Sequence, residues 1–119
     1  MKYLCLAWFE GNPIGALPDS EKTALDRDSL AYDRGLEKSG HFIAAQALQS
    51  PDTAVIVRVR DGKVSTTDGP FAETKEQLGG FILIEARDLN EAIRIAAGIP
   101  IAKFASIEVR PIYEIPNPG

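Results

Sequence analysis

Hydrophobic and polar positions along the chain follow two different periods. Four segments of strand length are apolar or alternate apolar with polar: residues 3–9, 41–48, 79–86 and 106–112. Two other segments, 17–40 and 88–98, place apolar residues near the 3.6-residue spacing of a helix. These patterns predict the order strand, helix, strand, then an intervening segment, then strand, helix, strand.

Both predicted helices carry start and stop signals. In the first, Pro18, Asp19 and Ser20 mark the start and Gly40 the end, while one face is formed by Leu25, Ser29, Tyr32 and Leu36. In the second, Asp88 is the expected N-cap, with Glu91 three residues later in a pattern that resembles a capping box. Its expected core side and end are formed by Leu89, Ala92, Ile93, Ala96, Gly98 and Pro100.

The intervening segment predicts a tight β-hairpin. Asp61-Gly62 separates two β-rich runs, and this dipeptide favours the positive φ angles of a two-residue turn. Val55, Val57 and Val59 share one face, and the other face is formed by Ile56, Arg58 and Arg60.

This order predicts an α+β fold: a ferredoxin-like split βαβ with an inserted β-hairpin, in which two helices cover one face of an antiparallel sheet. Strands 3–9 and 79–86 are apolar on both faces, so the second face also needs cover. A second copy of the chain supplies that cover most simply, which predicts a homodimer with the two sheets packed face to face.

Composition places the chain among ordinary globular proteins. It has 119 residues, 45% of them hydrophobic and 25% charged, which suits one domain over 1–119 with a loose tail at about 114–119. A net charge of −4 with scattered basic residues argues against nucleic acid as a partner. No segment resembles a signal peptide or approaches the roughly 18 apolar residues of a membrane span, so we expect a cytoplasmic protein.

The chain contains one cysteine and one histidine, which argues against a disulfide and a zinc site. Cys5 lies within an apolar run and is expected to be a buried apolar residue rather than a reactive thiol. His41 follows Gly40 at the start of a strand, where a rim position is more common than a catalytic one. It is nevertheless the only imidazole available for acid–base catalysis.

The stretch from Thr66 to Ala86 combines turn signals and charges in front of an apolar strand. Asp68 is interpreted either as the residue that fixes a turn at Gly69-Pro70 or as a carboxylate facing a cleft. Thr74 and Gln77 suggest one helical turn over Lys75 to Leu78, closed by Gly79. Glu73, Lys75 and Glu76 then either pair at the surface of that turn or converge with Asp68.

Several of these residues together resemble a known family. Asp68-Gly69-Pro70-Phe71, continued by Glu73, Lys75, Glu76 and Gly79-Gly80-Phe81, is similar to the DGPF branch of the YCII-related proteins, and the similarity runs from Met1 to about Tyr113. The resemblance implies a dimeric α+β barrel in mostly bacterial proteins of unsettled function. Many members are encoded beside extracytoplasmic-function sigma factors, which implies a possible regulatory role.

The sequence departs from the family pattern at two points. The first predicted helix lacks the histidine that the narrower YCII branch carries there and that was proposed to pair with an aspartate. Gln46 stands where DGPF proteins often have a carboxylate. Both departures weaken the transfer of a histidine-based mechanism.

Three possibilities therefore remain open. In the first, a cleft near the DGPF loop binds a small molecule and works without a cofactor, with Asp68 and Glu76 as acid and base. Lys75 would orient or neutralise charge, and the ligand-binding residues would be Phe71, Glu73 and Arg58. In the second, the protein is a non-catalytic dimeric accessory or regulatory module that binds another protein, for example a sigma factor. A purely structural dimer without a ligand is the third possibility.

Overall fold

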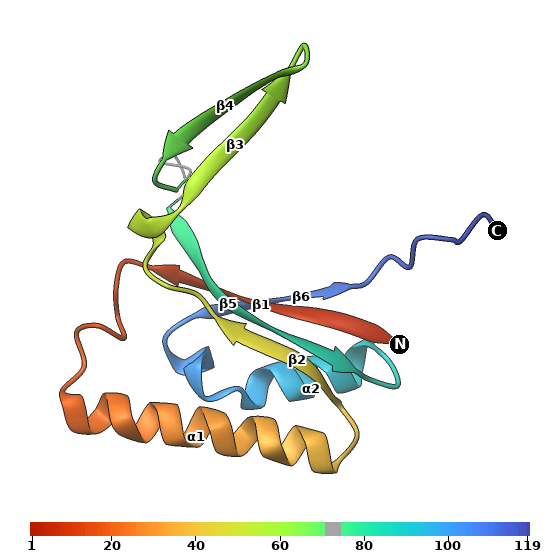
Figure 1. Ribbon diagram of the computed structural model, residues 1–119. Helices are drawn as coiled ribbons and strands as arrows, with labels where there is room; N and C mark the ends of the chain where they lie inside the picture. Colours follow the sequence, from red (N-terminus) through yellow and green to blue (C-terminus); the bar gives the residue numbers. More distant parts are fainter. Residues whose placement is uncertain (71–74) are drawn as a thin grey trace.

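The computed structural model describes residues 1–70 and 75–119. Its main element is a four-stranded antiparallel sheet in the order β2-β5-β1-β6 (Figure 1). The strands are β1 (Lys2–Glu10), β2 (Phe42–Ala47), β5 (Glu76–Glu85) and β6 (Ser106–Pro111). The helices are α1 (Asp19–Lys38) and α2 (Leu89–Gly98), with short 3-10 turns η1 (Pro51–Thr53) and η2 (Pro100–Lys103).

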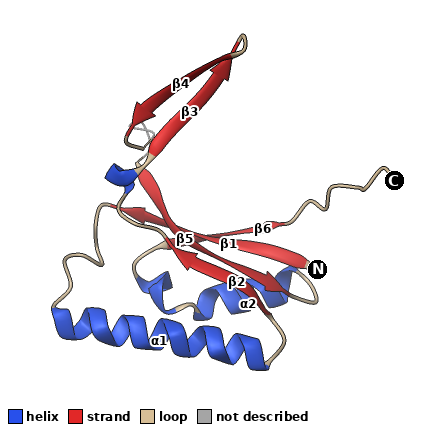
Figure 2. Ribbon diagram, in the orientation of Figure 1, coloured by secondary structure: helices blue, strands red, loops and turns tan. Residues whose placement is uncertain are grey.

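The strand order is that of a ferredoxin-like α+β fold, as the sequence predicted. Both helices lie on the same face of the sheet, and the other face carries no helix (Figure 2). The predicted hairpin is formed by β3 (Val55–Arg60) and β4 (Lys63–Asp68), which pair only with each other as a separate two-stranded sheet. We call these two strands the ribbon.

The turn of the ribbon has the predicted geometry. Asp61 and Gly62 have φ angles of 52° and 73°, values that aspartate tolerates and glycine favours. The register pairs Val57 with Thr66 and Val59 with Val64. The ribbon rises from the sheet on the side opposite the helices (Figure 1).

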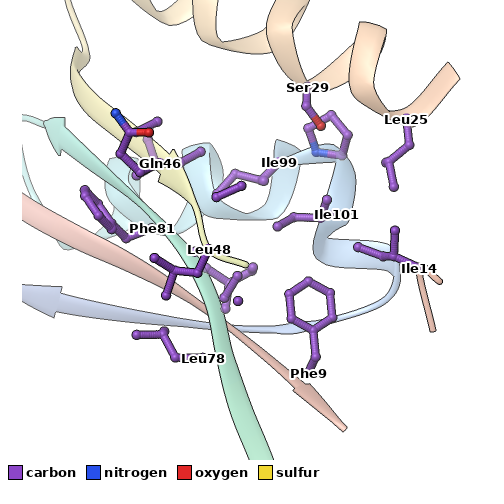
Figure 3. Close-up of a pocket in the computed structure, with 18 of the residues that line it drawn as sticks. Phe9, Ile14, Leu25, Ser29, Gln46, Leu48, Leu78, Phe81, Ile99 and Ile101 are labelled. Atoms are coloured by element: carbon purple, nitrogen blue, oxygen red, sulfur yellow. The ribbon is translucent and has the colours of Figure 1, made fainter. Parts of the chain in front are cut away.

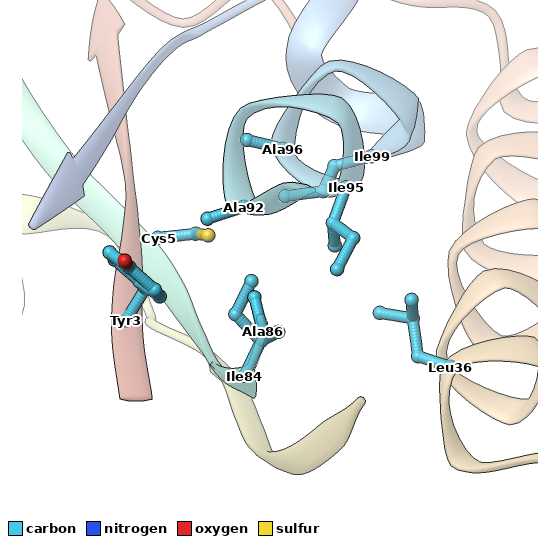
Figure 4. Packing of buried hydrophobic residues seen from close by; sticks show 9 residues of the cluster. All are labelled: Tyr3, Cys5, Leu36, Ile84, Ala86, Ala92, Ile95, Ala96 and Ile99. Carbon is cyan, nitrogen blue, oxygen red and sulfur yellow. The ribbon is translucent and has the colours of Figure 1, made fainter. Parts of the chain in front are cut away.

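The core lies between α2 and one end of the sheet (Figure 4). Tyr3 and Cys5 of β1 and Ile84 of β5 are each at most 2% exposed. Ala92 and Ile95 of α2 pack in the same buried cluster, and the short alanine side chain lets the helix approach the strands closely.

The predicted N-cap of α2 is confirmed, but its predicted core side is partly wrong. The Asp88 carboxylate accepts a hydrogen bond of 2.9 Å from the backbone N–H of Glu91. Leu89 and Ile93 are 48% and 49% exposed, whereas Ile95 is buried. The helix is rotated so that the Ala92, Ile95 and Ala96 side faces the sheet, because small residues permit close packing there.

The predicted helical turn at Lys75 to Leu78 is also wrong. Residues 76–78 are the first residues of β5, and they pair with Glu10, Phe9 and Trp8 of β1. A bulge between Ala7 and Trp8 shifts the register at this point. The long β1 strand offers backbone partners to this segment, and tertiary pairing therefore overrides the local helical signal. Thr74, the proposed cap of that turn, lies outside the described residues.

Candidate functional site

A large cleft lies between α1 and the sheet, at the end away from the core (Figure 3). Its volume is about 1090 Å³, which is at the upper end of the range of small-molecule sites. Leu25 and Ser29 of α1 form one wall, and Ile99 and Ile101 near η2 form another. The cleft opens past the β2 edge of the sheet, where it is bordered by Gln46, Leu48, Leu78 and Phe81.

The cleft exists because its floor is made of very small residues. The strand register places Ala7, Gly80 and Ala47 side by side across β1, β5 and β2, and all three line the cleft. A Cβ atom at Gly80 would lie 2.8 Å from the carbonyl oxygen of Gln46, so this position excludes a larger residue. Four residues further along β1 and β5, and five along β2 because of its register shift, the corresponding row is Tyr3, Ile84 and Phe42. We call Ala7, Gly80 and Ala47 the small row, and Tyr3, Ile84 and Phe42 the bulky row.

Polar side chains enter the cleft from α1. Asp26, Ser29 and Asp33 all line it, and their spacing along the chain keeps them on one side of the helix. The pKa of Asp33 is raised, first by burial and then by the nearby Glu37 carboxylate. A carboxyl group with a raised pKa in a mainly apolar cleft is suited to exchange protons with a ligand or to pair with a cationic group.

The sequence analysis did not identify Asp33 as a site residue. It did place Ser29 on the apolar face of the first helix between Leu25 and Leu36. A hydroxyl on an otherwise apolar helix face indicates that this part of the face borders a cleft rather than the core. Following that face one turn further would have led to Asp33.

The residues that the sequence proposed as an acid–base trio belong to different parts of the fold: Asp68 to the ribbon, and Glu76, with Lys75 just before it, to the main sheet. Asp68 is the exposed last residue of β4, paired with Val55, and the next residue, Gly69, donates a 2.7 Å hydrogen bond to the Ala54 carbonyl. Glu76 is the first residue of β5, adjacent to Gln77 and Leu78 of the cleft lining. This places one member of the trio next to the cleft rim.

Lys75 pairs with a carboxylate that the sequence analysis did not consider. Its Nζ lies 3.6 Å from Oε1 of Glu10, and both side chains are largely exposed. An exposed pair of this kind stabilises a fold by about 0–1 kcal/mol. The lysine therefore marks the outer rim of the sheet beside Glu76.

Of the three predicted ligand-binding residues, the structure describes Arg58, which lies in the ribbon. Arg58 is an exposed residue of β3, paired with Ser65 on the face opposite the valines. Phe71 and Glu73 lie outside the described residues.

His41 is placed at the opposite end of β5 from Glu76. Its Nδ1 lies 2.8 Å from the carbonyl oxygen of Glu85 and 3.9 Å from a carboxylate oxygen of Glu91. Because a carbonyl only accepts, the contact to Glu85 requires a proton on Nδ1. Ten residues of strand span about 30 Å, so His41 and the Glu76 end of the strand cannot share one small ligand.

The Cys5 thiol is expected to be unreactive in this fold. Burial raises the pKa of its thiol to about 11, and the side chain is 2% exposed. Among residues 1–70 and 75–119, no group of three or more histidine, cysteine or carboxylate side chains is arranged to hold a metal ion. Within the same residues, no helix is long and apolar enough to cross a membrane.

Comparison with known proteins places the chain in context. A family model described as the YCII-related domain matches residues 1–116. An uncharacterised protein of Rhizobium meliloti (strain 1021) is 34% identical to this chain over 114 residues, which span 94% of the chain and 92% of that relative.

Proposed function

Because the chain belongs to the YCII-related family, with a domain match over residues 1–116, we propose that it binds a small, mainly apolar molecule in the cleft beneath α1. The observation that supports this most directly is the small row. Ala7, Gly80 and Ala47 leave space on the helix side of a sheet whose other end is fully packed. A molecule with an apolar body and one basic group fits this lining, since the Asp33 carboxyl in it can pair with a cation.

We also propose cofactor-free proton transfer as the reaction that such a cleft suits. A carboxyl with a raised pKa releases and accepts protons nearer to neutral pH than an ordinary aspartate. Asp26, Asp33 and Asp52 line the cleft, and Glu76 lies next to Gln77 of its lining, so acid and base roles fall to these carboxylates. Asp68 remains a further acid–base candidate, and Lys75 remains the candidate for orienting or neutralising charge, in keeping with the proposed DGPF branch.

The helix-free face of the sheet supports the proposal of a homodimer. By strand alternation this face presents Leu4, Leu6 and Trp8 of β1 together with Phe81 and Leu83 of β5. Sheet-sized apolar faces of monomeric proteins are normally covered. A second copy packed on this face would also border the mouth of the cleft, where Phe81 lies.

The alternative function is a non-catalytic regulatory module, for example one that binds a sigma factor. It is favoured by the apolar and basic groups that the ribbon exposes outside the cleft. Under that alternative, filling the cleft would leave the interaction intact. Under the small-molecule proposal, filling the cleft removes the function.

A thermal-shift screen with amphipathic amines, carboxylic acids and neutral metabolites tests the proposal. Ala45 lies on the cleft floor, and Ala45→Leu would occupy the space that a ligand needs. We expect a compound that raises the melting temperature of the wild type to lose that effect in Ala45→Leu. Asp33→Asn should weaken binding of basic compounds by about tenfold or more, as expected for the loss of one charged contact.

Glu21→Gln is the matched control. Glu21 lies in the first turn of α1, is exposed and does not line the cleft, so this variant should bind like the wild type. Asp68→Asn distinguishes the two proposed carboxylate sites, since it should alter binding only if the ligand reaches the ribbon. Equal binding by Ala45→Leu and the wild type would rule out the cleft.

A further inference from the structure

One stripe of α1 borders the cleft with an apolar side chain between two carboxylates. Asp26, Leu30 and Asp33 all line the cleft. Their spacing of four and then three residues makes them neighbours on the same side of a helix. Leu30 is 58% exposed, so much of its side chain is available to a molecule in the cleft. We call these three residues the α1 stripe.

The cleft lining carries negative charge without a cation to balance it. Among the described residues, Asp26, Asp33 and Asp52 are the charged side chains that line the cleft. None of the three takes part in an ion pair within the described part of the chain, and Lys22, one turn before Asp26, forms none with it. Unpaired carboxylates around an apolar cleft create a negative potential that attracts cationic groups.

The two carboxylates of the α1 stripe lie at different depths in the cleft. Asp33 is half-buried and lies three residues before Leu36, which belongs to the buried core cluster. Asp26 is exposed and follows Leu25, which lines the cleft together with Ile14 (Figure 3). Seven residues of α-helix rise about 10.5 Å, so the two carboxylates are attached to the helix at points about that far apart.

The space beside the α1 stripe suits a hydrocarbon chain. Ile99 and Ile101 near η2 and Ala45 of β2 give the cleft apolar walls. A chain that lies along Leu30 between such walls loses its contact with water, which is favourable for binding. Only an elongated molecule can occupy this space and reach both Asp26 and Asp33.

We infer that the cleft selects linear molecules that carry an amine at each end of an apolar chain. This specificity rests on the proposed small-molecule site, and it adds a second cationic group to the one that pairs with Asp33. The first ammonium group pairs with Asp33 at the inner end, the chain lies along Leu30, and the second ammonium group pairs with Asp26. A monoamine of the same length makes the first two contacts and lacks the third.

Isothermal titration calorimetry with three amines tests this specificity. Octane diamine has an eight-carbon chain with an amine at each end, octylamine has the same chain with one amine, and butane diamine is too short to span the α1 stripe. We expect octane diamine to bind the wild type about fivefold more tightly than octylamine, because the second amine adds one exposed ion pair. Butane diamine should bind more weakly than octane diamine, since it cannot reach both carboxylates.

Substitutions in the α1 stripe separate the contribution of each contact. Asp26→Asn should reduce the preference for octane diamine over octylamine to about twofold or less and leave octylamine binding within about twofold of the wild type. Leu30→Gln should weaken the binding of both compounds, because it removes apolar contact area from the middle of the chain. The matched control is Asp28→Asn, which removes the same charge from an exposed position of α1 that does not line this cleft. It should keep the preference of the wild type.

Each contrary result has a defined meaning. Equal binding of octane diamine and octylamine, with both blocked by Ala45→Leu, would overturn the specificity for two amines and leave the proposed cleft function intact. A preference that Asp28→Asn also removes would come from net charge and would overturn the specificity. So would a preference that survives Asp26→Asn and disappears in Asp52→Asn. If no compound of the thermal-shift screen loses its effect in Ala45→Leu, the proposed function fails together with the specificity.

Discussion

The bulky row and the small row lie on the same face of the same sheet, yet they differ in burial. Ile84 is fully buried in the bulky row, beneath Ala92 of α2. Ala47 in the small row is exposed on the floor of a cleft. The difference shows that one strand can build a core at one end and a binding cavity at the other. Ala7 and Gly80 of the small row are themselves buried, so the exposure is confined to Ala47 at the β2 edge. The pairing of β2 with β5 also shifts in register between Phe42 and Ala44, which lies between the two rows.

The largest expected effect comes from shortening a side chain in the bulky row. Ile84→Ala should lower the free energy of unfolding by about 2–5 kcal/mol, because it leaves a cavity in packed surroundings. Ala47→Ser in the small row should change the same quantity by about 0.5 kcal/mol or less, since that site already faces space. Urea unfolding followed by circular dichroism measures both. A loss below about 1 kcal/mol for Ile84→Ala would contradict the assignment of the core.

A medium effect on stability is expected when a side chain is enlarged at either end of the sheet, in the core or in the cleft. Ala92 of α2 is fully buried over the bulky row, so Ala92→Leu should destabilise the fold by about 1–3 kcal/mol through overpacking. Ala45→Leu adds the same atoms to the cleft floor and should change stability by less than about 1 kcal/mol. Equal destabilisation by the two substitutions would show that the cleft is closed in solution.

The smallest expected effect concerns two aspartates, Asp88 and Asp33, whose ionisation changes the stability of the fold in opposite directions. The pKa of Asp88 at the α2 N-cap is lowered, first by the hydrogen bond from the Glu91 backbone N–H, so its carboxylate stabilises the fold above the unfolded pKa. That contribution is lost as the pH falls through the lower pKa of the folded state. The pKa of Asp33 is raised, so its ionisation opposes folding, and the opposition disappears on acidification.

Asp88→Asn should therefore lower the melting temperature at neutral pH and flatten its acid dependence, whereas Asp33→Asn should raise it slightly. Differential scanning fluorimetry from about pH 7 down to about pH 2 follows the melting temperature on both sides of the ordinary aspartate pKa of about 4. Shifts of the same sign in the two variants would contradict the proposed environment of Asp33 in the cleft.

The elements were accessible from the sequence because their signals are local. The Asp61-Gly62 turn, the Asp88 cap and the two-sided apolar character of residues 3–9 and 79–86 each depend on neighbours along the chain. The fold class followed from their order, and the family resemblance followed from the motif that begins at Asp68-Gly69-Pro70-Phe71. The helical turn expected at Lys75 to Leu78 failed because its backbone is paired by a strand about seventy residues away. No local signal competes with such pairing.

The candidate site was less accessible for a physical reason. The cleft depends on Ala7, Gly80 and Ala47 meeting across three strands. Single small residues far apart in a sequence give no indication that they will become neighbours in a sheet. The raised pKa of Asp33 comes first from burial and then from the nearby Glu37 carboxylate, and the burial is decided only by tertiary packing. The trio Asp68, Lys75 and Glu76 was conspicuous in sequence because charges near glycine stand out, and its role stays a prediction.

The sequence by itself determined the order of strands and helices, the ribbon turn, the helix cap and the membership of the YCII-related family. Tertiary structure alone decided which face of α2 is buried, that the ribbon stands off the sheet, and that three small residues line up beneath α1. The physical reason is the range of the forces. Backbone preferences act between neighbouring residues, whereas cavities and exposed faces arise only where distant side chains are brought together.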